Sequence, residues 1–279
     1  MALIGPRARA CVEATVLACA LLVAAVATAA EQPTPSRWLA AGLDDPPPSR
    51  QGDRVLLVGS SSMRGNLGRQ LALEFGRIGY ETETFAVSAS GISRPDFFDW
   101  QAKVAELPID GNTAAVLVYV GVNDPQGIWL PPDEREALGA RDAWVRWQEQ
   151  RWLHVYRDRM AAWIDSMCGK GARRVVVLTP ADVRWTGLQE RLRRVRRAQI
   201  LAVRKSRCGR AVSTSGDLAF LRDPEPDEPS RRMPDGYHLS TPGAEIVWQR
   251  IAPHLLRLVG GVPAQGDVVQ GRGNGKPGT

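Results

Sequence analysis

The chain has 279 residues, a formal net charge of +6 and a pI near 9.5. This basic balance would suit a nucleic-acid partner, but the N-terminus carries an export pattern that disfavours this class of partner.

The export pattern has three parts. Arg7 and Arg9 precede an apolar run over 14–26, and small residues follow up to Ala30. This is the arrangement of a secretory signal peptide, so we expect a periplasmic or secreted protein. Retention of the run as a membrane anchor is the less favoured alternative, because the run is only weakly apolar, being Ala-rich, and a good cleavage site follows it. Cleavage would leave about 250 residues, the length of one large domain.

Composition divides the chain into four segments. Residues 1–30 are the predicted signal peptide, 31–53 a Pro-rich lead-in, 54–259 a single folded domain and 260–279 a Gly-rich disordered tail.

Strands and helices alternate along the folded segment. Apolar runs predict strands over 54–58, 83–87, 114–120, 173–178 and 211–213. Helical patterns predict helices over 67–78, 97–106, 141–167, 187–207 and 244–259. We therefore expect an α/β fold: a single flavodoxin-like doubly wound parallel sheet of five strands, in the order 2-1-3-4-5, with helices on both faces.

The first strand ends in Gly59-Ser60-Ser61-Ser62 and leads into a helical segment. A hydroxyl at such a turn lies beside helix N-terminal amides, which favour negative charge. A nucleophile that generates an oxyanion would benefit from this position. Phosphate binding or helix capping is the alternative for this turn.

Asp235 and His238 lie on a turn-rich loop before the last helix. The chain has three His, and His154 and His254 fall on predicted helices. A serine nucleophile needs an imidazole base whose tautomer is held by a carboxylate, and this pair would supply both groups. A capping or buried structural imidazole is the alternative for His238.

Two further strand ends carry candidate hydrogen-bond donors. Gly91 follows the second strand, and Asn123 follows the third. Backbone N–H groups and a side-chain amide aimed at one point form an oxyanion hole. Turn chemistry could explain each position alone, but four strand-end sites in this order are hard to explain in that way.

The order Ser, Gly, Asn and Asp-x-x-His resembles that of the SGNH, or GDSL, hydrolase superfamily. The segments VGSSSM, SASGISRPDFFDW, GVND and DGYHLSTPG match its four sequence blocks, so the resemblance covers almost all of the folded segment. The second block and the Trp- and Arg-rich region before the fourth strand are similar to a bacterial periplasmic branch long catalogued as a domain of unknown function. The resemblance implies the SGNH hydrolase fold and a catalytic domain over 54–259.

The resemblance also implies roles for single residues. It makes the catalytic triad Ser61, His238 and Asp235, and the oxyanion hole the N–H groups of Ser61, Gly91 and Asn123. This chain has Ser60 where the superfamily usually has Asp. The choice of Ser61 over Ser60 or Ser62 as nucleophile rests on the alignment.

Together with the export signal, the resemblance implies a serine esterase or O-acyltransferase that works through an acyl-serine. The expected substrate is an acylated carbohydrate of the cell envelope or another ester, with acetyl as the expected group. A transferase would add a partner, a membrane protein that donates the acyl group. A non-catalytic glycan-binding or assembly protein that retains the fold is the alternative. No residue cluster has metal-ligand spacing, so neither a metal nor another cofactor is implied.

The candidate substrate-binding residues are Arg94, Gln126 and Trp129. Arg94 belongs to the second block, and the other two lie in an insertion over 125–141. An exposed Trp at a cleft edge would suit a sugar ring, although Trp at helical spacing more often packs in a core.

Cys168 and Cys208 would remain after signal cleavage. An even pair in an oxidising compartment permits a disulfide, and two separate buried thiols are the alternative.

Overall fold

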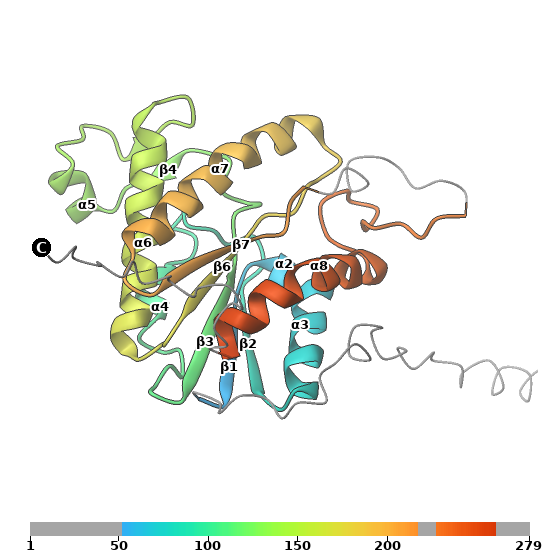
Figure 1. Cartoon of the computed structure of the whole chain (residues 1–279). Coiled ribbons are helices and arrows are strands. Elements are labelled where there is room, and N and C mark those ends of the chain that lie inside the picture. The colour runs from blue at the N-terminus through green and yellow to red at the C-terminus, as the bar shows by residue number, and fades with distance from the viewer. Residues whose placement is uncertain (1–51, 217–226, 261–279) are drawn as a thin grey trace, which may run out of the picture. The chain divides into compact units, whose positions relative to one another are not determined.

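The computed structural model describes residues 52–216 and 227–260 (Figure 1). The predicted signal peptide, nearly all of the predicted lead-in and residues 261–279 of the predicted tail lie outside these ranges. Within the described ranges, no helix has both the length and the apolar character needed to cross a membrane.

Five parallel strands form the central sheet. They are β1 (Arg54–Gly59), β2 (Glu81–Ala86), β3 (Thr113–Tyr119), β6 (Val175–Thr179) and β7 (Gly209–Ser213). Their order is β2-β1-β3-β6-β7, and every neighbouring pair is parallel (Figure 1). Counted along the chain, this is the order 2-1-3-4-5, so the expected topology is confirmed.

The central strands are apolar because helices cover both faces of the sheet. Every residue of β3 and β6 is buried, as expected for parallel strands between two helical layers. The edge strand β2, with sequence ETETFA, has no fully buried residue. Its charged positions discourage pairing of the free edge with another chain.

Helices α2 (Ser61–Arg64), α3 (Asn66–Arg77) and α8 (Thr241–Gly260) lie on one face of the sheet (Figure 1). The ring of Phe75 on α3 packs edge-on against Trp248 on α8, with ring centroids 6.0 Å apart. On the other face, α4 (Trp100–Lys103), α6 (Arg151–Lys170) and α7 (Thr186–Lys205) cover the main apolar core. Alternate strand residues such as Val116 and Val118 point into that core.

The long helix predicted over 141–167 is wrong at its N-terminal end. Trp144 and Val145 form the short strand β5 (Trp144–Val145), which pairs antiparallel with β4 (Ile128–Trp129). A small helix, α5 (Pro132–Ala137), lies between these strands in sequence. The Glu149 carboxylate accepts the Arg146 N–H at 2.7 Å and closes a turn, so α6 begins only at Arg151. The helix predicted over 97–106 is likewise reduced to α4.

A disulfide joins Cys168 and Cys208, with their Cα atoms 6.0 Å apart. It links the last turn of α6 to the residue before β7. The structure thus decides between the two alternatives for this pair in favour of the bridge.

Candidate active site

Ser61, His238 and Asp235 form one hydrogen-bonded chain. The Oγ atom of Ser61 lies 2.9 Å from Nε2 of His238, and Nδ1 of His238 lies 2.7 Å from Oδ2 of Asp235. All three residues are partly exposed. When Nδ1–H donates to the carboxylate, Nε2 is free to accept the serine proton, so the three groups have the geometry of a nucleophile, its base and an orienting acid.

The structure distinguishes the three adjacent serines. Ser60 is fully buried, and its Oγ has no hydrogen-bond partner among the described residues. Its backbone is fixed instead, because its N–H donates to the Tyr119 carbonyl at 3.1 Å. Of Ser60, Ser61 and Ser62, only Ser61 has an Oγ that contacts the imidazole in the described part of the chain.

A tight turn presents Asp235 and His238. One carboxylate oxygen of Asp235 accepts the backbone N–H groups of Tyr237 at 3.0 Å and His238 at 2.9 Å. This is the turn chemistry expected of an Asp-Gly sequence. Gly236 has φ +77°, and a Cβ there would lie 2.5 Å from the indole nitrogen of Trp185, so only glycine fits.

The carboxylate of Asp235 is stabilised in its ionised form. Burial raises its pKa, but the hydrogen bonds from His238 and Tyr237 outweigh burial and leave the pKa below its usual value. An ionised carboxylate is the form that holds the imidazole tautomer and stabilises an imidazolium.

The predicted oxyanion donors follow three neighbouring strands, β1, β2 and β3. One N–H of the Asn123 side chain donates to the Ser90 carbonyl at 2.9 Å, and within the described ranges the other donates no hydrogen bond. Among the described residues, the backbone N–H groups of Ser61 and Gly91 donate no hydrogen bond. A Cβ at Gly91 would lie 2.3 Å from a carboxylate oxygen of Asp124, which explains the glycine. The role of these donors stays a prediction.

Asp124 is a site residue that the sequence analysis missed. It is fully buried, with Oδ1 accepting the Ser93 N–H and Oδ2 accepting the Tyr156 hydroxyl, both at 2.8 Å. Burial raises its pKa, and the hydrogen bonds from Ser93 and Tyr156 offset only part of this effect. Asp124 therefore ties the segment after Gly91 to the turn that carries Asn123.

Arg94 is engaged within the protein. Its guanidinium forms an ion pair with Asp96 at 2.7 Å and lies 5.1 Å from the ring centroid of Trp144. The pair raises the pKa of Arg94 and lowers that of Asp96. The role of Arg94 in substrate binding stays a prediction.

Gln126 and Trp129 also have partners within the protein. The side-chain amide of Gln126 donates to the Asn123 carbonyl at 2.5 Å, and the backbone carbonyl of Gln126 accepts the indole N–H of Trp152 at 2.7 Å. Trp129 is partly buried, and its backbone N–H donates to the Ser93 carbonyl at 2.9 Å. Both residues therefore adjoin the loops of the site, while their role in substrate binding stays a prediction.

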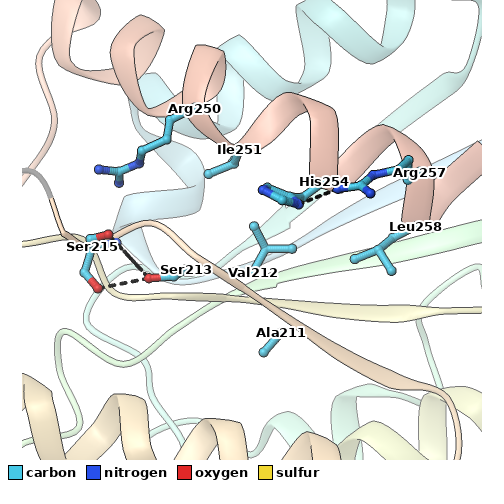
Figure 2. Close-up of a pocket in the computed structure, with 9 residues that line it drawn as sticks. All are labelled: Ala211, Val212, Ser213, Ser215, Arg250, Ile251, His254, Arg257 and Leu258. Carbon is cyan, nitrogen blue, oxygen red and sulfur yellow. Dashed lines mark hydrogen bonds between the residues drawn. The ribbon is translucent and has the colours of Figure 1, made fainter. Parts of the chain in front are cut away.

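Two cavities differ in their relation to the triad. The cavity that His238 lines has a volume of about 10 Å³, close to the space of one water molecule. A groove of about 580 Å³ lies between β7 and α8, where His254 bonds to Arg257 at 2.7 Å (Figure 2). Arg250, which lines this groove, lies nine residues after Thr241 at the start of α8, which is about 14 Å along the helix axis. The groove therefore lies further along α8 than the end that adjoins the loop of His238. The groove contains none of the predicted site residues.

A family model described as "Protein of unknown function (DUF459)" matches residues 54–254. The chain belongs to the DUF459 family. The match confirms the branch that the sequence pattern indicated, and it spans Ser61, Gly91, Asn123, Asp235 and His238. The sheet order and the two helical layers of this DUF459 protein are those expected for the SGNH hydrolase fold.

No curated protein shows significant similarity to this DUF459 chain. Solved structures do match it. An acetylxylan esterase from Geobacillus stearothermophilus is 15% identical, with a TM-score of 0.48 over 76% of this chain and 95% of the other. An alpha/beta hydrolase enzyme from the metagenome of Lake Arreo is 16% identical, with a TM-score of 0.49 over 76% and 97%. A carbohydrate esterase family 3 protein from Talaromyces cellulolyticus is 13% identical, with a TM-score of 0.47 over 75% and 99%.

Proposed function

We propose that this DUF459 protein is an exported serine esterase or O-acyltransferase that works through an acyl-serine. The observation that carries the proposal is the hydrogen-bonded chain from Ser61 through His238 to Asp235. Partial exposure of all three residues leaves the serine hydroxyl open to an incoming ester. The catalytic domain extends over 54–259, which includes all groups used in the mechanism.

In the first half of the reaction, Oγ of Ser61 bonds to the carbonyl carbon of the ester, and its proton passes to Nε2 of His238. The carbonyl oxygen becomes an oxyanion, for which the N–H groups of Ser61 and Gly91 and the amide of Asn123 are the donors. Collapse of this tetrahedral intermediate breaks the bond between the carbonyl carbon and the alcohol oxygen of the ester. That oxygen takes the proton from Nε2 of His238, and the alcohol leaves. The acyl group stays on Ser61.

In the second half, His238 takes a proton from a second hydroxyl compound, whose oxygen attacks the acyl-serine. Water gives a free acid, and a sugar hydroxyl gives a new ester. In both outcomes the bond between the acyl carbon and Oγ breaks, and Nε2 of His238 returns its proton to Oγ of Ser61. The same donors hold the oxyanion, so hydrolysis and transfer differ only in the acceptor. A transferase would also need an acyl-donor protein at the membrane as partner.

The substrate class we infer is an O-acetylated carbohydrate of the cell envelope or an exported polysaccharide. The predicted signal peptide supports this location.

The testing experiment compares p-nitrophenyl acetate, butyrate and octanoate, and measures acetate release from acetylated oligosaccharides, with purified wild-type protein and Ser61→Ala. The proposal requires turnover of the acetyl compounds by the wild type and its loss in the variant. Transfer is measured as acetyl appearing on an added unacetylated oligosaccharide. Absence of turnover on every ester would contradict the enzyme assignment.

A further inference from the structure

Exposed apolar side chains gather around the loop that carries Asp235 and His238. Among the described residues, eight large apolar side chains are exposed, and three of them belong to this loop or bond to it. These are Trp185, Met233 and Tyr237, with 63%, 41% and 37% of their surface exposed. An exposed apolar cluster beside a polar site indicates a surface that contacts a ligand.

The position of Trp185 is fixed although its ring is exposed. Its indole N–H donates to the Asp235 carbonyl at 2.8 Å. The ring packs directly on Gly236, where any Cβ would lie 2.5 Å from the indole nitrogen. The backbone N–H of Arg184 also donates to the Gly236 carbonyl at 3.2 Å. A ring held in this way is exposed to water in the free protein. Its burial by a ligand would therefore stabilise the complex, with no entropic cost for ordering the Trp185 side chain.

Tyr237 extends the aromatic surface to the base. Its ring centroid lies 4.5 Å from that of His238, with the two rings tilted by 48°. Its backbone N–H is held by the Asp235 carboxylate at 3.0 Å. Trp185 thus bonds to the backbone carbonyl of Asp235, the ring of Tyr237 contacts the imidazole of His238, and both aromatic rings are exposed beside the loop.

The shape of this border favours one kind of ligand. The cavity of about 10 Å³ that Tyr237 and His238 line includes neither Ser61 nor Trp185, so a substrate bound at Ser61 lies outside it. A flat aromatic surface with polar atoms at its edge suits a rigid ring that has an apolar C–H face and hydroxyl edges. A flexible acyl chain would instead need an enclosed apolar pocket.

We propose that Trp185 and Tyr237 form a platform on which a pyranose ring of the substrate stacks. The platform holds either the sugar that carries the ester or its neighbour in the glycan. This inference rests on the proposed esterase function and assigns its carbohydrate specificity to residues outside the insertion over 125–141. Trp185 is then a specificity-determining residue that contacts substrate, and its N–H also positions Asp235.

Two variants of Trp185 separate these roles. Trp185→Ala removes both the ring face and the indole N–H, whereas Trp185→Phe keeps an aromatic face and removes only the N–H. We expect Trp185→Ala to lower kcat/KM on an acetylated oligosaccharide at least tenfold more than on p-nitrophenyl acetate, because the small ester does not reach the platform. Trp185→Phe should reduce both activities by similar factors. Leu73→Ala, at a 42% exposed position on α3, is the matched control and should change neither activity.

A binding measurement keeps this test independent of turnover. In the Ser61→Ala protein, isothermal titration with the unacetylated oligosaccharide should show a Kd raised about tenfold or more by Trp185→Ala, and less by Trp185→Phe. Unchanged glycan binding together with equal losses on both substrates would overturn the platform while leaving the esterase intact. A selective loss on p-nitrophenyl octanoate would also overturn it and assign the surface to acyl chains. Lack of wild-type turnover on p-nitrophenyl acetate would instead contradict the esterase function itself.

Discussion

Oγ of Ser61 and Nε2 of His238 lie 2.9 Å apart, although 177 residues separate them in the sequence. Ser61 begins α2, the helix that follows the end of β1, and His238 lies three residues before α8. Because α8 packs against α3 on the same face of the sheet, the loop before α8 is brought over the turn after β1. The fold therefore supplies the contact on which the proposed chemistry depends.

Asn123→Ala should lower kcat by about two to three orders of magnitude with little change in KM. The side-chain N–H left free by the bond to Ser90 is expected to bind the oxyanion, which exists only in the transition state. Steady-state kinetics on p-nitrophenyl acetate would measure the effects on kcat and on KM separately. A rise in KM with an unchanged kcat would make Asn123 a ground-state binding residue.

The state of Asp235 predicts a pH dependence of stability. Its pKa is below the usual value of 3.8, so the folded protein binds a proton there less readily than the unfolded chain. The stabilisation is therefore fully present above the unfolded pKa and disappears as the pH falls through the lower, folded pKa. Thermal unfolding of wild type and Asp235→Asn between pH 7 and pH 2 should show the largest Tm difference at neutral pH. A Tm difference between the two proteins that grows toward low pH would contradict the prediction that ionised Asp235 stabilises the fold.

Tyr156→Phe should destabilise the protein by about 1–3 kcal/mol, because it leaves a buried carboxylate oxygen of Asp124 without a hydrogen-bond donor. It should also lower kcat, since Asp124 fixes both the segment after Gly91 and the turn of Asn123. Chemical denaturation of Tyr156→Phe, Asp124→Ala and the double variant would measure the coupling of the two side chains. Strictly additive effects on the free energy of unfolding would show that the bond between Tyr156 and Asp124 does not stabilise the fold.

Trp129→Ala tests the substrate contact predicted from the insertion. If Trp129 forms a wall of the substrate groove, the change should reduce activity on acetylated polysaccharide far more than on a small chromogenic ester. Its partial burial and the backbone bond to Ser93 leave packing as the competing role. Equal losses on both substrates, measured as kcat/KM, would assign Trp129 to packing.

Local sequence signals predict the fold and the strand ends at which the candidate site residues lie, whereas the choice of Ser61 among three adjacent serines rests on the resemblance to the SGNH superfamily. Apolar runs identify the buried strands, and parallel strands direct their carboxyl ends to one edge of the sheet. Residues that follow β1, β2 and β3, such as Ser61, Gly91 and Asn123, are then expected near one another. The Asp-Gly turn at Asp235 likewise follows from its sequence alone.

Contacts between distant segments were not predictable in the same way. Trp144 and Trp147 have a spacing that suits a helix, yet Trp144 pairs with Trp129 across a small sheet. Nothing within 141–150 indicates that partner. The role of Asp124 was likewise not predictable, because it depends on a buried hydrogen bond from Tyr156, which lies 32 residues away in the sequence. The exposed ring of Trp185 is another case, since its contact with the Asp235 loop spans 50 residues.

The most direct test of the proposed function is covalent labelling of Ser61 by a fluorophosphonate. Attack by an activated serine Oγ on phosphorus expels fluoride and leaves one phosphonyl group per chain, which intact-protein and peptide mass spectrometry can locate. Ser60→Ala is the matched control, because its hydroxyl is buried and without a partner among the described residues, so its removal should preserve labelling and folding. We predict one label on Ser61 in wild type and Ser60→Ala, none in Ser61→Ala, and a loss of kcat of about three orders of magnitude in Ser61→Ala alone. A folded wild-type protein that remains unlabelled, or a label on another serine, would contradict the proposed acyl-serine mechanism and favour a non-catalytic glycan-binding role or a different nucleophile.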